Sequence, residues 1–75
     1  MARDEEIIEI LVSEDEDFKA LVDNHRELDK SIQQLDSKIY LLPQEKMERK
    51  NLSKMKLAKK DRIAKVISDY RKKRN

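Results

Sequence analysis

The sequence predicts an all-α fold, namely an antiparallel two-helix hairpin of the coiled-coil kind that follows a short helix and assembles into a helical bundle. The 75 residues include no glycine and one proline, so few residues oppose helix formation. Apolar residues from Phe18 to Leu42 recur at gaps of three and four. Pro43 then ends this pattern, and a second long helical stretch follows. We therefore expect one helical-hairpin domain over residues 1–75.

The first expected element is a short helix at about residues 4–12. Its first turn is acidic, and negative charge is favourable at a helix N-terminus. Aliphatic residues then crowd its second half, beginning with Ile7 and Ile8. A helix of this length is marginal alone, so we expect the rest of the chain or a second subunit to cover these side chains.

A long helix is expected at about residues 14–40. Ser13 and Glu16 have the spacing of a capping box, in which a serine hydroxyl caps the helix and a glutamate reaches back to it. The apolar positions that follow form an unbroken heptad seam, to which Leu42 would also belong. The seam of this helix consists of Phe18, Leu21, His25, Leu28, Ile32, Leu35 and Ile39.

The chain is expected to turn at about residues 41–44, since Pro43 disfavours helix at the preceding residue and suits the first turn of a new one. A second long helix should occupy residues 45–71, with a basic tail at 72–75. Lys59 falls near the centre of its apolar stripe, and we expect its ammonium group to reach Asp29 across the hairpin. The stripe that completes the hairpin seam consists of Leu52, Met55, Ile63, Val66 and Tyr70.

Each long helix also carries a motif. The first reads Phe18-x-x-Leu21-x-x-x-His25-x-x-Leu28-Asp29-x-x-Ile32-x-x-Leu35, and the second reads Leu52-x-Lys54-x-Lys56-Leu57-x-x-Lys60-Asp61-x-Ile63. Together these motifs resemble the YdcH-like family of small uncharacterised bacterial proteins, although leucine is usual where this chain has Lys59. The resemblance covers about residues 18–63. It implies a helical hairpin without enzyme activity and supplies no catalytic residues.

The composition excludes several kinds of site. Without cysteine the chain has no disulfide, no thiolate nucleophile and no thiolate-bound zinc. Without glycine it has no phosphate-binding loop of the nucleotide-binding folds. The apolar runs are too short for a membrane span or a signal peptide, so we expect a cytoplasmic protein that does not bind membranes.

Few residues are candidates for chemistry. His25, the one histidine, could respond to pH or bind a metal, but we favour a seam residue that fixes the hairpin register through a hydrogen bond. Asp61 lies among basic residues and is expected to balance their charge. Tyr40 could stack on a base, although packing at the hairpin tip is favoured. We expect no enzyme, no metal, no cofactor and no small-molecule substrate.

The charge is divided between the two halves of the chain. Residues 1–44 carry a net charge of −7 and residues 45–75 a net charge of +9. This division favours either helices of opposite charge lying side by side or contact with nucleic acid. A sequence-independent RNA or DNA surface is therefore the alternative function. Its candidate residues are Lys54, Lys56, Lys60, Arg62, Lys65, Arg71 and Lys72.

The function favoured by the sequence is protein–protein interaction, through self-association into a dimer or a tetramer. A chain this short buries a thin core, and partner chains commonly complete such burial. The second helix also has apolar residues outside the hairpin seam. The residues expected to face a partner are Ile7, Ile8, Leu11, Met47, Leu57 and Ala64.

Overall fold

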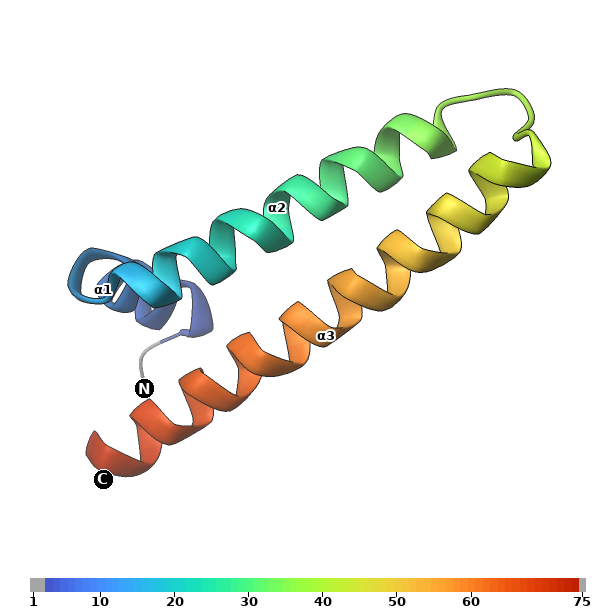
Figure 1. Cartoon of the computed structure of the whole chain (residues 1–75). Helices are drawn as coiled ribbons and strands as arrows, with labels where there is room; N and C mark the ends of the chain where they lie inside the picture. The colour runs from blue at the N-terminus through green and yellow to red at the C-terminus, as the bar shows by residue number, and fades with distance from the viewer. Residues whose placement is uncertain (1–2, 75) are drawn as a thin grey trace.

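The computed structural model describes residues 3–74, and at Arg74 it describes the backbone alone. The regular secondary structure of these residues is helical. These are α1 (Asp4–Glu14), α2 (Glu16–Asp36) and α3 (Pro43–Arg74). The prediction of an all-helical fold is confirmed. Helices α2 and α3 lie side by side and run in opposite directions, while α1 packs against the start of α2 and the end of α3 (Figure 1).

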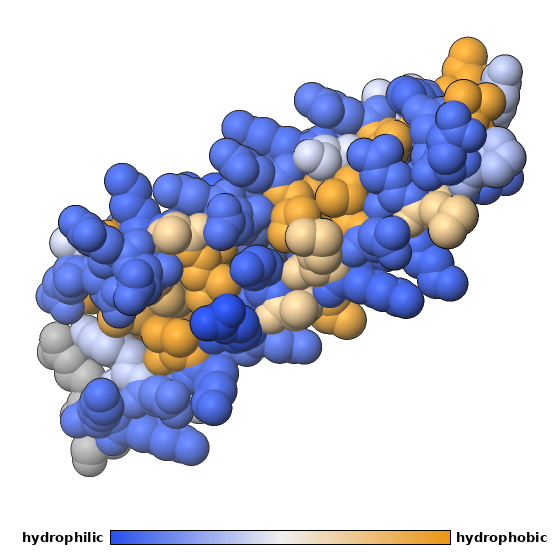
Figure 2. All heavy atoms as spheres, in the orientation of Figure 1, coloured by the Kyte–Doolittle hydropathy of each residue, from blue (hydrophilic) through white to orange (hydrophobic). Residues whose placement is uncertain are grey.

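The core is a narrow apolar layer between α2 and α3, with a contribution from α1. The molecule measures 49 × 22 × 17 Å, and a helix with its side chains is about 10–12 Å wide, so every helix keeps one face in solvent. A band of hydrophobic residues follows the line where α2 meets α3 on the face shown in Figure 2. The buried hydrophobic residues are Ile7, Phe18, Val22, Ile32, Leu35 and Ile67.

Most of the predicted seam lies in or beside this layer. Phe18, Ile32 and Leu35 are buried, and the remaining seam residues are half-buried apart from two. Those two predictions are wrong. Ile39 is fully exposed because it lies beyond the end of α2, and Met55 is 51% exposed because it lies at the edge of the α3 stripe.

The boundary between α1 and α2 is set by Asp15, which has extended backbone. Its carboxylate oxygen Oδ1 accepts hydrogen bonds from the backbone N–H groups of Asp17 at 3.0 Å and Phe18 at 3.2 Å. Asp15 is therefore the N-cap of α2. The predicted cap, Ser13, instead lies inside α1, where its hydroxyl donates to the carbonyl oxygen of Ile10 at 2.7 Å. The predicted capping box is wrong, because α1 continues two residues beyond 12 and already contains Ser13.

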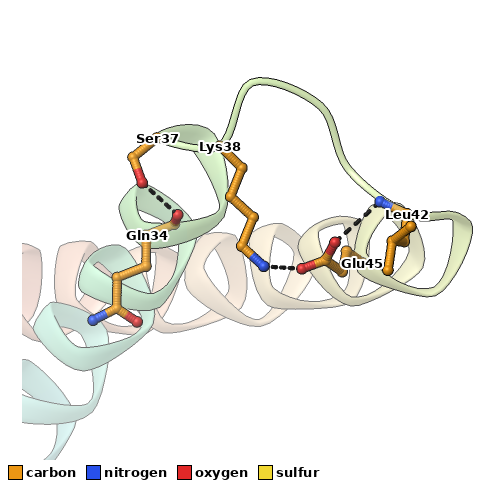
Figure 3. A network of polar contacts seen from close by, with 5 residues as sticks. All are labelled: Gln34, Ser37, Lys38, Leu42 and Glu45. Atoms are coloured by element: carbon orange, nitrogen blue, oxygen red, sulfur yellow. Dashed lines mark hydrogen bonds and ion pairs between the residues drawn. The ribbon is translucent and has the colours of Figure 1, made fainter.

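Helix α2 ends at Asp36, four residues before the predicted end at Tyr40. Ser37 closes it, since its backbone N–H donates to the carbonyl oxygen of Gln33 at 3.0 Å and its hydroxyl donates to that of Gln34 at 2.7 Å (Figure 3). The physical reason for the early end is the proline: α3 starts at Pro43, so the chain must reverse direction within residues 37–42.

Helix α3 begins at Pro43 rather than at the predicted residue 45, and its first turn is held by Glu45. One carboxylate oxygen of Glu45 accepts the backbone N–H of Leu42 at 3.0 Å, and the other pairs with Lys38 (Figure 3). This is the glutamate half of a capping box, which the sequence reading did not identify. Proline costs nothing at the first helical position, because its missing N–H would have no helical acceptor there.

Helix α3 continues to Arg74, so the predicted basic tail of residues 72–75 is helical up to Arg74. No proline or glycine stops the helix in this region. Positive charge also stabilises a helix C-terminus. Asn75 lies outside the described residues.

We expect the cap of α2 to be measurable with two neighbouring alanine substitutions. Asp15→Ala removes the acceptor of two backbone N–H groups and should lower the free energy of unfolding by about 1 kcal/mol. Ser13→Ala, the matched control, removes a hydroxyl inside α1 and should change it by less than about 0.5 kcal/mol. Urea unfolding followed by circular dichroism measures both. A larger loss for Ser13→Ala would restore the capping box predicted from the sequence.

Candidate interaction surfaces

One side of the α2/α3 pair is closed by ion pairs between the helices. Asp36 pairs with Arg49, whose Nη2 atom lies 3.0 Å from Oδ2, and Asp29 accepts the Nζ atom of Lys56 at 2.6 Å. Asp29 and Asp36 are seven residues apart and so follow one line along α2, as Arg49 and Lys56 do along α3. We call this side the paired side.

The expected partner of Asp29 was Lys59, and this prediction is wrong. Lys56 takes the position one helical turn before Lys59. The difference in register follows from the early end of α2 and the early start of α3. Gln33 also donates to Asp29, at 2.9 Å.

These ion pairs perturb the acids that form them. The hydrogen bond from Lys56 lowers the pKa of the Asp29 carboxyl below its ordinary value, and that from Arg49 lowers the pKa of Asp36 in the same way. Lys38 and the backbone N–H of Leu42 lower the pKa of Glu45. Asp36 is exposed and Asp29 and Glu45 are half-buried, so water still screens these ion pairs, and charge selects the helix orientation more than it stabilises the fold.

A further ion pair joins the two ends of the described chain. Asp4 of α1 accepts Nη2 of Arg71 in α3 at 2.6 Å. Ile7, one turn further along α1, is 1% exposed. The prediction that Ile7 faces a partner is therefore wrong, since α1 turns this side chain into the fold of its own chain. Ile8 and Leu11 are half-buried.

The opposite side of the α2/α3 pair is open. Two adjoining depressions share Asn24 and Lys59 and together form one groove along the line between the helices. Its apolar lining comes from Leu21, Leu28, Met55 and Val66, and its rim carries Asp17 and Glu27 on α2 and Arg62 on α3. Leu21, Leu28 and Val66 are half-buried, and Met55 is mostly exposed. We call this surface the open side.

The remaining apolar surface lies on the outer face of α3 and at the connector, which is the segment 37–42 between α2 and α3. Met47 is 68% exposed and Leu57 is 57% exposed, and Ala64 is exposed as well. These three predicted partner residues are thus accessible. The connector adds Ile39 and Tyr40, so the expected packing of Tyr40 at the tip is wrong. Its ring faces solvent because α2 has already ended.

The predicted nucleic-acid residues divide into two groups. Lys56 and Arg71 are bound to acids of their own chain, because they lie on or near the paired side, and are not available as predicted. The others, which are Lys54, Lys60, Arg62, Lys65 and Lys72, are exposed. Asp61 is exposed as well.

The described part of the chain contains no group of three or more histidine, cysteine, aspartate or glutamate side chains that could hold a metal ion. His25 is half-buried in the seam, and its Nε2 atom is buried without a hydrogen-bond partner among the described residues. The hydrogen bond expected of His25 therefore does not involve this atom. No described helix has the length and apolar character that crossing a lipid bilayer requires.

Comparison with protein-family models places most of the chain in a known family. Residues 18–67 match the model of a family described as proteins of unknown function, DUF465, which agrees with the YdcH-like resemblance of the two motifs. The match spans α2, the connector and most of α3, and it starts after α1. No curated protein and no solved structure was found to match the chain.

The ion pairs of the paired side should make stability depend on pH. The lowered pKa values mean that these carboxylates stabilise the fold above about pH 4 and lose this effect as the pH falls through the lowered values. Asp36→Asn should therefore reduce the free energy of unfolding at about pH 7 and make little difference at about pH 2.

The matched control is Asp23→Asn, which neutralises an exposed acid of the same helix outside these ion pairs. It should have a smaller effect at neutral pH. Urea unfolding at the two pH values measures both variants. An equal loss for Asp36→Asn at both pH values would show that the ion pair does not carry the pH dependence.

Proposed function

The chain belongs to the DUF465 family of proteins of unknown function, and we propose that it acts as a non-catalytic module that self-associates into a helical bundle. The observation that carries the proposal is the open side. The apolar layer between α2 and α3 is bordered by ion pairs on one side and continues to solvent on the other, where Leu28 and Met55 line the groove. A second copy of the hairpin would cover this apolar surface.

The charge on the rim of the groove favours one arrangement of the two copies. The α2 rim carries Asp17 and Glu27, and the α3 side carries Lys59 and Arg62. A two-fold axis parallel to the hairpin sets α2 of each copy on α3 of the other, so acidic residues meet basic ones. An axis across the hairpin would instead set the acidic helices against each other, which like-charge repulsion disfavours. The proposed assembly is therefore an antiparallel four-helix bundle of two chains.

The energetics agree with a dimer of moderate affinity. Interfaces of stable complexes bury roughly 800 Å² per partner, and much of the hydrophobic gain offsets the entropy lost on association. Met55 is the large apolar residue of the groove with the greatest exposure, since it is 51% exposed in the isolated chain. Fully burying an exposed methionine contributes about 1.5–3 kcal/mol, so covering the exposed half of Met55 contributes roughly half of that in each copy of a two-fold dimer.

We expect the protein to sediment at about twice its chain mass of 9.0 kDa. Met55→Glu should raise the dimer dissociation constant at least about 100-fold, because a charge enters the interface in both copies. Met47→Glu is the matched control, since it makes the same change at a 68% exposed methionine of the same helix, away from the groove. Sedimentation equilibrium measures all three proteins. A wild-type monomer, or dissociation by Met47→Glu alone, would overturn the proposed interface.

The arrangement of the copies has its own test. Glu27→Lys and Lys59→Glu should each weaken the dimer, and the double variant should recover most of the affinity, because the exchanged charges again face each other. Recovery would not occur if the acidic helices met across the interface. The double-variant measurement therefore separates the two possible two-fold axes.

A further inference from the structure

The outer face of α3 carries a band of exposed lysines. At 100° per residue, five of them fall within an arc of about 100°, namely Lys46, Lys50, Lys54, Lys65 and Lys72. This arc is centred opposite Leu52 and Ile63, which face α2. We call it the outer stripe, and it extends over about 39 Å at 1.5 Å per residue. Asp61 is the acidic residue that falls within it.

The lysines of the outer stripe are not the cations that hold the helices together. The cations of α3 that pair with α1 and α2 are Arg49, Lys56 and Arg71. The connector pairs with α3 through its own cation, Lys38, which binds Glu45. The two acids of α2 that form ion pairs, Asp29 and Asp36, are thus matched by other cations, and the outer stripe points away from that helix. Its positive charge is directed into solvent along the length of the molecule.

At the end nearest the connector, the stripe borders a groove that also has apolar residues. Lys46, Lys50 and Lys54 border a shallow groove with Leu41 and Leu57 as its apolar lining. Tyr40, which precedes Leu41, is 76% exposed. An exposed aromatic ring at the end of a cationic stripe is a combination with which proteins bind single-stranded nucleic acid, since a base can stack on the ring while the phosphates along the strand meet lysines.

We propose that the outer stripe binds single-stranded RNA or DNA without sequence preference, with Tyr40 as a stacking platform at the tip. A flexible single strand can adjust its path to lysines spread over this arc, whereas the phosphates of a rigid duplex wind away from it. A lipid surface fits less well, because the large exposed apolar residues of the outer face, Met47 and Leu57, lie with those of the connector toward one end of the stripe, and the rest of the stripe has none to insert into a bilayer. The open side lies on another face of α3, so this binding is independent of self-association.

The proposal is tested with a labelled 20-nucleotide oligouridylate by fluorescence anisotropy. If four phosphates are neutralised, the affinity should fall about 50-fold between 50 mM and 200 mM salt. The double variant Lys50→Glu, Lys54→Glu should weaken binding at least about tenfold. Lys19→Glu, Lys30→Glu is the matched control, because it makes the same change in net charge at exposed lysines of α2. It should retain most of the affinity.

The stacking role of Tyr40 is tested separately. Tyr40→Ala should weaken binding about fivefold or more, as expected for a lost base–aromatic stack, while Ile39→Ala, at an exposed neighbour without a ring, should not. Both side chains lie outside the core, so neither change should unfold the protein.

Four results would overturn the proposal. These are equal losses for the two lysine pairs, duplex binding as tight as that of the single strand, equal binding of a polyglutamate of the same charge, and binding to anionic phospholipid vesicles but not to the oligonucleotide. Met55→Glu, which addresses self-association, should leave the intrinsic affinity of each chain for the oligonucleotide unchanged, so the two proposals can fail separately.

Discussion

The reversal of the chain between Asp36 and Pro43 is the constraint on which the rest of the structure depends. It decides which residues of α2 and α3 face each other, and with them the ion pairs of the paired side. Glu45 holds the reversal at two points, the backbone of Leu42 and the side chain of Lys38. Because α3 has no other interruption, this one turn sets the position of every surface along the second helix.

The fold class could be predicted because the heptad pattern and the proline both leave direct traces in the sequence. Phe18, Ile32 and Leu35 are buried where the pattern placed them. The same pattern failed at Ile39, since periodicity continues past the residue where the backbone has to turn. The signal that would have located the turn was Glu45, three residues after Leu42, the spacing of a cap and its glutamate.

The surfaces were harder to predict for a physical reason. Helical periodicity separates the inner face of α3 from its outer face, and the outer lysines and leucine could be identified in this way. It does not say on which flank of the seam the acids of α2 find their partners. That depends on the register, in which Lys56 and not Lys59 reaches Asp29. The prediction that Ile7 faces a partner failed for a similar reason, because only tertiary packing decides where a short helix docks.

The docking of α1 has a consequence for how the molecule opens. Asp4 and Arg71 are 67 residues apart in the sequence and meet only when α2 and α3 are already paired, so the docking of α1 on α3 depends on the hairpin. An 11-residue helix contributes little stability of its own. Fluctuations should therefore release α1 before the two long helices separate, and hydrogen exchange at its amides would be faster than in the middle of α2. The segment that matches the family is the part that would stay folded. Helix α1 would detach from it and expose the start of α2 and the end of α3.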